Sequence, residues 1–346
     1  MKYEVIVLGG GIAGSSLAYH LCKKGVRSVL IDRSVDPDGA TAVSGGMVTR
    51  LQDHPDDIKY AIYATRFYRE VDSSRESISD GLLSIEDEEY AINDYDRYRG
   101  ILGDIELYEP TEIIDRWPYL NIHEDELGIY SKNDLTINPR KFLEIIWSRV
   151  EDFGCEILRG YTATHIICKE DYAKAVMLSN YDLVHGDLIV SCLGAWNKSF
   201  LRSNGVKVKT YLISIPIFKF RVEENLDVGI WDDEVYGYWR PDENHIIGGG
   251  YDGYIVKYPH EGFGEPLGYS YDLALDIFKF RFNFRYFKLV GAWTGVASFT
   301  YNYKPIANVS KKFKNLYIID GLGGEGLVRA PALSLNLAKE IVDKWI

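Results

Sequence analysis

Three glycines near the start of the chain have the spacing of a turn that binds a dinucleotide. They are Gly9, Gly11 and Gly14, in the run Gly-Gly-Gly-Ile-Ala-Gly. The first glycine permits a tight turn, the second lets a pyrophosphate approach the backbone, and the third lets a helix pack closely against a strand. The helix that follows would present free N–H groups and a partial positive charge to the phosphates. The spacing therefore indicates a dinucleotide site.

The flanking residues supply the elements that such a turn needs. Residues 4–8 form an apolar run typical of a buried strand, and apolar residues recur at helical spacing from 13 to 22. A second apolar run at 28–31 ends at Asp32, whose carboxylate can accept hydrogen bonds from both hydroxyls of a ribose. The acid stands near the expected ~20 residues beyond the turn, and it disfavours the 2′-phosphate of NADP. A plain strand–helix–strand unit is the alternative interpretation.

The segment from 38 to 49 favours FAD over NAD as the dinucleotide. It is rich in small residues, Asp-Gly-Ala-Thr-Ala-Val-Ser-Gly-Gly-Met-Val-Thr. It resembles the corresponding segment of the D-amino-acid oxidase family of flavoenzymes, which includes glycine oxidase, sarcosine oxidase and the D-amino-acid dehydrogenases. The resemblance implies that this segment wraps the ribityl chain and the isoalloxazine ring of FAD, where small side chains give the flat ring access to backbone N–H donors. A flexible surface loop is the alternative.

The C-terminal part of the chain repeats the order of strand, glycine-rich turn and helix. We expect a buried strand at 316–320, a turn at 321–326 (Gly-Leu-Gly-Gly-Glu-Gly) and an amphipathic helix at 330–341. The turn and the Ala-Pro-Ala after it resemble the same family's second FAD-binding segment. This implies that the helix start points at the pyrimidine edge of the flavin. Two such turns at opposite ends of one chain favour FAD.

Other stretches also resemble the family, so the resemblance covers nearly the whole chain. A helix start is expected at Pro139, and Ala163 stands where the family's backbone contacts adenine. The strand at 187–196 ends in Gly-Ala-Trp, which implies passage near the pyrophosphate, although Trp196 could equally belong to the core. The residues expected to bind FAD are Gly9, Gly11, Ile12, Ala13, Gly14, Asp32, Arg33, Ala40, Thr41, Ser44, Gly45, Gly46, Met47, Ala163, Gly194, Trp196, Gly321, Gly323, Gly324, Glu325, Gly326 and Leu327.

The resemblance implies an α/β fold with two discontinuous domains. The first is a Rossmann-type FAD-binding domain of the glutathione-reductase kind, expected from residues 1–50, 135–205 and 290–346. The second is an α+β substrate domain with a mostly antiparallel sheet, expected from residues 51–134 and 206–289.

Three stretches of the expected substrate domain have a local pattern that can be interpreted. A strand at 210–221 and a hairpin at 235–250 fit the antiparallel sheet. For residues 55–115 we expect helices and loops.

Arginine and tyrosine side chains are the candidates for holding a substrate. A carboxylate needs a cation, and the planar guanidinium binds it through two hydrogen bonds. Arg50, Arg240 and Arg329 lie next to segments expected at the flavin, although each could equally be a surface or ion-paired residue. We expect Arg50, Arg240 and the hydroxyl of Tyr238 to be the catalytic-site residues. Aromatic residues that could wall the pocket are Tyr236, Tyr238, Tyr251 and Trp293.

The family's usual carboxylate clamps are missing. Glycine oxidase carries an arginine where this chain has Gly324, and sarcosine oxidase carries a lysine close to Val328. How a carboxylate would be anchored is therefore open. Sarcosine oxidase also attaches its flavin through a cysteine near the segment that resembles 297–302, where this chain has none, so the resemblance implies noncovalent FAD.

The resemblance implies an enzyme that oxidises the C–N bond of an amine or amino acid by hydride transfer to flavin N5. D-amino acids, glycine, and N-methyl or cyclic amino acids are all candidates, with O₂ or a quinone- or dye-type compound as the electron acceptor. One alternative is oxidation of the C–OH of a 2-hydroxy acid or of a glycerol-3-phosphate-type substrate. Others are a flavin subunit of a complex, a reductase using NAD(P)H, and a tRNA-modifying flavoenzyme. The single dinucleotide fingerprint weakens the reductase alternative.

Composition narrows the partners and the compartment. The 346 residues carry a net charge of −12, which disfavours nucleic acid as a partner. No apolar run reaches the ~20 residues of a membrane span, so we expect a cytoplasmic protein. The four cysteines form no CxxC pair, and we expect reduced thiols. No His/Cys pattern indicates a metal, a single glutamine fits a thermophile's composition, and the sequence does not set the oligomeric state.

Overall fold

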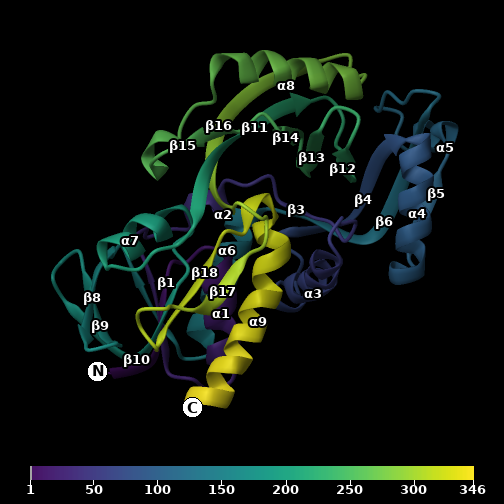
Figure 1. The fold of residues 1–346 in the computed structure, drawn as a ribbon. Helices are drawn as coiled ribbons and strands as arrows, with labels where there is room; N and C mark the ends of the chain where they lie inside the picture. Colours follow the sequence, from purple (N-terminus) through teal and green to yellow (C-terminus); the bar gives the residue numbers. More distant parts are fainter. Residues whose placement is uncertain (1) are drawn as a thin grey trace.

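A computed structural model describes residues 2–346, and these residues form two β-sheets (Figure 1). The strands of the first sheet are β1 (Lys2–Leu8), β2 (Ser28–Asp32), β7 (Glu156–Arg159), β8 (Ala163–Lys169), β9 (Tyr172–Leu178), β10 (Leu183–Ser191), β17 (Ile306–Val309) and β18 (Leu316–Asp320). Its main path runs β17-β18-β10-β1-β2-β7, and the neighbours from β18 to β7 are parallel. This is the parallel sheet expected for a dinucleotide-binding fold.

The second sheet is mostly antiparallel, as expected. Its strands are β3 (Met47–Val48), β4 (Ile78–Asp87), β5 (Ile105–Tyr108), β6 (Glu126–Ile137), β11 (Thr210–Val222), β12 (Gly229–Asp232), β13 (Gly237–Asp242), β14 (His245–Gly250), β15 (Tyr254–Val256) and β16 (Phe287–Thr300). The path runs β15-β11-β14-β13-β12-β4-β6-β3, with β16 beside β11 and β5 beside β6. Among the described strands of this second sheet, only β12 and β4 pair in parallel. The expected strand at 210–221 and the expected hairpin are confirmed as β11 and as β13 with β14.

Helices cover both sheets. They are α1 (Ile12–Lys23), α2 (Gly39–Ala42), α3 (Pro55–Val71), α4 (Glu88–Leu102), α5 (Pro110–Arg116), α6 (Pro139–Asp152), α7 (Asn197–Ser203), α8 (Gly268–Arg281) and α9 (Gly326–Trp345). Figure 1 shows α8 lying across the second sheet and α9 running along the first. Among residues 2–346, no helix has both the length and the apolar character needed to cross a membrane.

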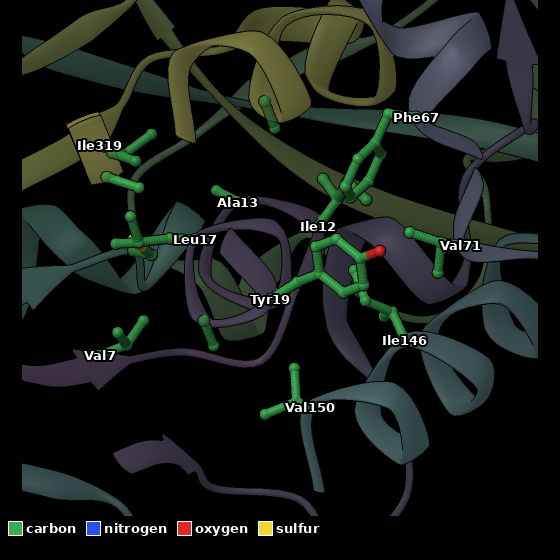
Figure 2. Close-up of a cluster of buried hydrophobic side chains, with 14 of the residues drawn as sticks. Val7, Ile12, Ala13, Leu17, Tyr19, Phe67, Val71, Ile146, Val150 and Ile319 are labelled. Carbon is green, nitrogen blue, oxygen red and sulfur yellow. The ribbon is translucent and has the colours of Figure 1, made fainter. Parts of the chain in front are cut away.

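Helix α1 is enclosed on all sides by the core of the first layer. Figure 2 shows Leu17 on α1 near Val7 of β1 and Ile319 of β18, while Tyr19 points toward α3. The Tyr19 and Phe67 rings meet edge to face with centroids 5.5 Å apart. Burying each such apolar side chain stabilises the fold by about 1.5–3 kcal/mol. This packing holds the start of α1 rigidly at the carboxyl end of β1.

The expectation of helices and loops over residues 55–115 is wrong in part. Strands β4 and β5 lie within this range, together with α3, α4 and α5. The partners of β4 are β6 and β12, which are distant in the sequence. Strand formation here depends on those distant partners, and the local residue pattern gives little sign of them.

Two segments pack on the other sheet from the one we expected. Helix α3 falls in the range assigned to the substrate domain, but it joins the core around α1, and Tyr68 donates a hydrogen bond to the Leu327 carbonyl (2.8 Å). The boundary expected at residue 290 falls inside β16, which pairs with β11 in the second sheet. The division into two folding domains stays a prediction.

The expectation of four reduced thiols is also wrong. A disulfide joins Cys22, near the end of α1, to Cys155, just before β7, with their Cα atoms 6.0 Å apart. Cys168 is exposed and free, and Cys192 is buried and free. The two bonded residues are 133 positions apart, so their proximity depends on the packing of α1 against α6 and not on a local motif.

We expect removal of this disulfide to lower the stability of the fold. Replacing both Cys22 and Cys155 by alanine should reduce the free energy of unfolding by about 2–4 kcal/mol, because the bond closes a long loop in the unfolded chain. Chemical denaturation followed by fluorescence measures the change, and Cys168→Ala is the control that should leave stability unchanged. Alkylation after denaturation without reductant should label only Cys168 and Cys192. Labelling of all four cysteines would contradict the disulfide.

Candidate active site

Two adjoining cavities lie at the carboxyl ends of the parallel strands. The first, of about 500 Å³, is lined by the first glycine turn, the end of β2 and the loop before α7. The second, of about 380 Å³, lies between the loop after α2, the second glycine turn and the second sheet. The residues that line both are Ile12, Ala40, Thr41, Ala297, Gly321, Gly323 and Gly326. The two cavities are therefore parts of one continuous site.

The first glycine turn brings α1 against β1 more closely than a side chain would allow. A Cβ on Gly14 would lie 1.8 Å from the Gly9 carbonyl oxygen, and Gly9 has a φ of +97°. Gly11 lines the first cavity just before α1 begins. The Ile12 N–H donates to Thr41 Oγ1 (3.2 Å), which ties the start of α1 to the loop at α2. The remaining free N–H groups at this helix start are available to an anion.

Asp32 is held at the end of β2 with its carboxylate on the first cavity. Its two oxygens accept hydrogen bonds from the backbone N–H groups of Gly10 (2.6 Å) and Ser34 (2.8 Å). Burial raises the pKa of this carboxyl, and the two backbone donors oppose the shift. Each oxygen keeps a lone pair for a further donor such as a ribose hydroxyl.

Trp196 lines the first cavity and also packs against a small hydrophobic cluster, where its ring stacks on Phe263. The guanidinium of Arg33 stacks on the Trp196 ring, 3.8 Å from its centre, and both residues line the cavity. Ala163 and Gly194 line the same cavity. The structure therefore brings these four residues, which come from three widely separated segments of the sequence, onto one cavity.

Asp320 is a site residue that the sequence analysis missed. It ends β18 and lines the first cavity, and Oδ1 accepts the Gly321 N–H (2.7 Å). Oδ2 of Asp320 and Oγ of Ser298, which lines the same cavity, are buried and have no hydrogen-bond partner. Burial raises the pKa of Asp320 to about 6. The sequence could have indicated Asp320, because this acid ends a strand and directly precedes a glycine-rich turn.

The loop after α2 fits closely around other chain segments at the second cavity. A Cβ on Gly45 would lie 2.2 Å from the Tyr238 ring, so this ring packs closely against the loop. A Cβ on Gly46, where φ is +78°, would lie 2.1 Å from the Ile137 carbonyl oxygen. Only glycine therefore allows the backbone at this point to face the cavity.

Nearly all of the residues that we expected at FAD line one of the two cavities. Gly14 is the exception, because it lies behind the turn against Gly9. The residues on the first cavity alone are Gly9, Gly11, Ala13, Asp32, Arg33, Ala163, Gly194 and Trp196. Those on the second alone are Ser44, Gly45, Gly46, Met47, Gly324, Glu325 and Leu327.

The structure does not place Arg50 at either cavity. Its Nε donates to Asp134 (2.5 Å), and Nη1 and Nη2 each donate to Asp104 (2.9 Å). The side chain is buried, and the two carboxylates neutralise its charge. The expectation that Arg50 binds a substrate is therefore corrected to a role in joining the loop after β3 to β6.

Arg240 also lies outside the lining of the cavities. It is buried behind Gly46, and its Nη1 donates to Asp242 Oδ1 (3.1 Å). Its Nε has no partner, and burial lowers its pKa. Tyr238 lines the second cavity as expected, so the structure brings Tyr238 but not Arg240 to the site.

The aromatic wall of the second cavity differs in part from the one expected. Tyr238 and Tyr251 line it, and Trp231 stands with them although the sequence analysis missed it. Trp293 instead donates to the Val43 carbonyl (2.8 Å) behind the wall, and Tyr236 is exposed away from the cavity. Trp231 lies on the short strand β12, whose pairing with β4 and β13 no local pattern indicated.

Comparison with known proteins identifies the chain's relatives. Residues 4–340 match the family described as FAD dependent oxidoreductase. The chain belongs to this family. Mitochondrial sarcosine dehydrogenase from mouse (Mus musculus) is 24% identical to this oxidoreductase. The match covers 98% of the present chain and 39% of the mouse protein.

Two solved structures share the fold of this oxidoreductase. An L-proline dehydrogenase from P. horikoshii superposes with a TM-score of 0.87 at 16% identity, covering 100% of this chain and 94% of that one. A glycine oxidase from Bacillus cereus gives a TM-score of 0.84 at 16% identity, covering 99% and 95%. These likenesses confirm the expected fold, a Rossmann-type FAD-binding unit with a second, mostly antiparallel sheet.

The residues on the two cavities fit FAD. The first cavity offers a helix start, the Asp32 carboxylate and the partnerless Asp320 Oδ2, which suit phosphate and hydroxyl groups. The second is bordered by glycines at 45, 46, 321, 323 and 324, so a flat ring can reach the backbone. The oxidoreductase can thus hold the cofactor along the continuous site, with the second sheet facing its far end.

We expect Gly46→Ala to abolish retention of FAD or to reduce it strongly. The new Cβ would meet the Ile137 carbonyl at 2.1 Å, and the φ of +78° adds strain for any L side chain. The ratio of flavin absorbance to protein absorbance after purification measures the effect. Gly100→Ala in α4 is the matched control, because a Cβ there meets nothing within 4 Å. Full flavin content in Gly46→Ala would show that the loop does not border the cofactor.

We expect Asp320→Asn to stabilise the FAD-free protein while weakening FAD binding. Burial raises the pKa of this carboxyl from 3.8 to about 6, so its ionisation costs stability increasingly from pH 3.8 to pH 6, and the full cost applies above pH 6. The variant should therefore gain about 1–2 kcal/mol at pH 8, and the gain should shrink at pH 5, where wild-type Asp320 is protonated. Thermal unfolding with and without added FAD measures both effects. A loss of stability at pH 8 would contradict this reasoning.

Proposed function

We propose that this enzyme oxidises the C–N bond of a small amine or amino acid, using noncovalently bound FAD. The single observation that carries the proposal is the continuity of the two cavities, with seven residues lining both. A second ligand in the half that faces the second sheet therefore lies directly against the flavin end of the cofactor. When bound, FAD supplies the acceptor for the hydride that leaves the carbon next to nitrogen.

The chain's own residues would position the substrate and exclude water. Trp231, Tyr238 and Tyr251 form one wall, with the centroids of Trp231 and Tyr251 5.6 Å apart and those of Tyr238 and Tyr251 6.2 Å apart. Burial raises the pKa values of both tyrosines, so their hydroxyls stay protonated and can donate hydrogen bonds. The amine loses two electrons and two protons to become an imine, and water hydrolyses the imine to a carbonyl compound with release of the nitrogen as ammonia or an amine.

The partners of this reaction are a small-molecule amine and an electron acceptor. The names of relatives support an amine, since they include a sarcosine dehydrogenase, a glycine oxidase and an L-proline dehydrogenase. O₂ or a quinone- or dye-type compound would accept the electrons. Noncovalent attachment is supported by the lining of the second cavity, where none of the described residues is Cys or His.

Anaerobic mixing of the purified, yellow protein with a substrate panel tests the proposal. Amines or amino acids should bleach the visible flavin absorbance, and 2-hydroxy acids and glycerol 3-phosphate should leave it unchanged. Admitting air afterwards restores the colour and yields peroxide if O₂ is the acceptor. Bleaching by hydroxy compounds alone would overturn the C–N assignment in favour of C–OH oxidation, and a protein that takes up no FAD would overturn it entirely.

A further inference from the structure

We propose that the second cavity selects a cationic amine that has no carboxylate next to the reacting carbon. The inference rests on the proposed amine oxidation and narrows its substrate class. It follows from the charged residues that line the cavity. Glu325 lines it beside an aromatic wall and forms no salt bridge with a described residue. Arg329, the cation among the described lining residues, is already paired with Asp57.

The one cation on the second cavity is already paired. Among its described lining residues, Arg329 is the single Arg or Lys. Its Nε and Nη2 donate to the two oxygens of Asp57 (2.8 and 2.6 Å), and Nη1 donates to the Leu322 carbonyl (3.0 Å). This fork-to-fork pairing uses the face of the guanidinium that would bind a substrate carboxylate. Releasing it would leave Asp57 buried without a partner, which is costly.

Among the described lining residues, Glu325 is the one acid on the second cavity, and no described Lys or Arg forms a salt bridge with it. Its sole hydrogen bond is a long one, from the Gln52 amide to Oε2 (3.4 Å), so Oε1 is free. Burial raises the pKa of Glu325 most, Arg329 opposes this rise, and the carboxylate of Asp57 adds a smaller rise. Because Arg329 forms its salt bridge with Asp57, Glu325 is left to pair with a substrate. An ammonium group against Glu325 would favour its ionised form and so oppose the effect of burial.

The wall facing this carboxylate suits a cation as well. The Tyr251 ring lies against both other rings of the wall, with its centroid 5.6 Å from that of Trp231 and 6.2 Å from that of Tyr238. Glu325 lines the same cavity as these three rings. Aromatic faces attract alkylammonium groups through their quadrupoles. An aromatic wall with one carboxylate is a recognition site for an amine cation.

Acidic residues beyond the lining extend the same potential. Asp233 accepts a hydrogen bond from Trp231 Nε1 (3.0 Å), and burial raises its pKa to about 6, with Asp53 and Asp94 adding to the shift. Burial also raises the pKa of Glu86 to about 7, and the same three aspartates contribute. Asp53 and Asp94 each lie within salt-bridge distance of Arg97 (3.9 and 3.7 Å), so part of their charge is compensated. Asp233 contacts the aromatic wall at Trp231, and its negative potential favours cations over carboxylates at this face.

Arg240 is another cation near the cavity, and the backbone at Gly46 lies between its side chain and the cavity. It lies behind Gly46, with its Cδ and Nε 3.0 Å from the position of a Cβ there. Its charge is shared with Asp242, which also accepts a hydrogen bond from Lys219 Nζ (2.8 Å). A substrate carboxylate on the cavity side would therefore meet Glu325 directly and Arg240 only through the loop.

Equilibrium binding of three non-oxidisable probes to the FAD-loaded protein tests the inference. Tetramethylammonium is a cation, pivalate is a carboxylate of similar shape, and glycine betaine carries both charges. Perturbation of the flavin spectrum and quenching of tryptophan fluorescence measure binding without turnover. We expect tetramethylammonium to bind about tenfold or more tightly than pivalate, with glycine betaine weaker than tetramethylammonium. Equal or tighter binding of pivalate would overturn the proposal.

Glu325→Gln isolates the carboxylate, because the amide keeps the size and removes the charge. We expect it to weaken tetramethylammonium binding about tenfold, to change pivalate binding little or to improve it, and to keep its flavin. Asp53→Asn is the matched control, since it removes one charge from an exposed side chain that does not line the cavity. An equal effect of both variants would assign the preference to the general field and overturn the role of Glu325.

Gly324→Arg tests the same idea in the opposite direction. A Cβ at this position meets nothing within 4 Å, so the turn has room for a side chain. An unpaired guanidinium beside the cavity should raise pivalate affinity about tenfold and reverse the preference. Pivalate binding by the unmodified protein that is lost in Arg240→Gln would instead place a carboxylate clamp at Arg240 and overturn the proposal.

The outcomes separate this inference from the proposed function. Probe binding is measured on flavin-loaded protein and does not require oxidation. If no amine reduces the flavin but tetramethylammonium binds in preference to pivalate, the oxidation proposal fails and the charge selectivity stands. If amino acids reduce the flavin faster than the matching decarboxylated amines, C–N oxidation stands and the inference fails.

Discussion

The site depends on backbone segments that approach one another more closely than any side chain would permit. A Cβ at Gly14 would lie 1.8 Å from the Gly9 oxygen, one at Gly46 2.1 Å from the Ile137 oxygen, and one at Gly321 2.4 Å from the Thr300 side chain. These approaches join α1 to β1, the loop after α2 to β6, and the second turn to β16. They bring the two glycine turns onto one continuous cavity, although more than 300 residues separate them.

Arginine in this chain is used largely to tie distant segments together. Arg281 is fully buried and is held by Glu126 and Asp232, Arg50 is held by Asp104 and Asp134, and Arg329 is held by Asp57. Removing one member of such a pair would leave a buried charge without its partner, at a cost of about 3–5 kcal/mol. Because these guanidinium groups form their salt bridges inside the protein, they leave Glu325, the acid on the second cavity, to interact with a ligand.

The glycine turns and the residues around them could be predicted from the sequence because their constraints are local. Where a ligand or another backbone segment approaches the turn after a strand closely, only glycine fits, and this requirement does not depend on distant residues. Gly9, Gly11 and the turn at 321–326 can therefore be recognised from the local sequence alone. The relation of Arg50 to Asp134, 84 residues away, is of a different kind, because only the pairing of β3 with β6 brings the two together. That Arg50 and Arg329 are cations could be known from the sequence, but the carboxylates that pair with them could not.

The same distinction explains why the aromatic wall and the disulfide were harder to predict than the cofactor half. Trp231 reaches the cavity through β12, which pairs in parallel with β4, and Cys22 meets Cys155 through the packing of α1 on α6. Both depend on contacts between segments whose own patterns are unremarkable. The cofactor half is built from short motifs that the ligand's phosphates and flat ring impose. The substrate half is built from long-range pairing in the second sheet, which is where a chain of this family can change what it binds while keeping the cofactor in place.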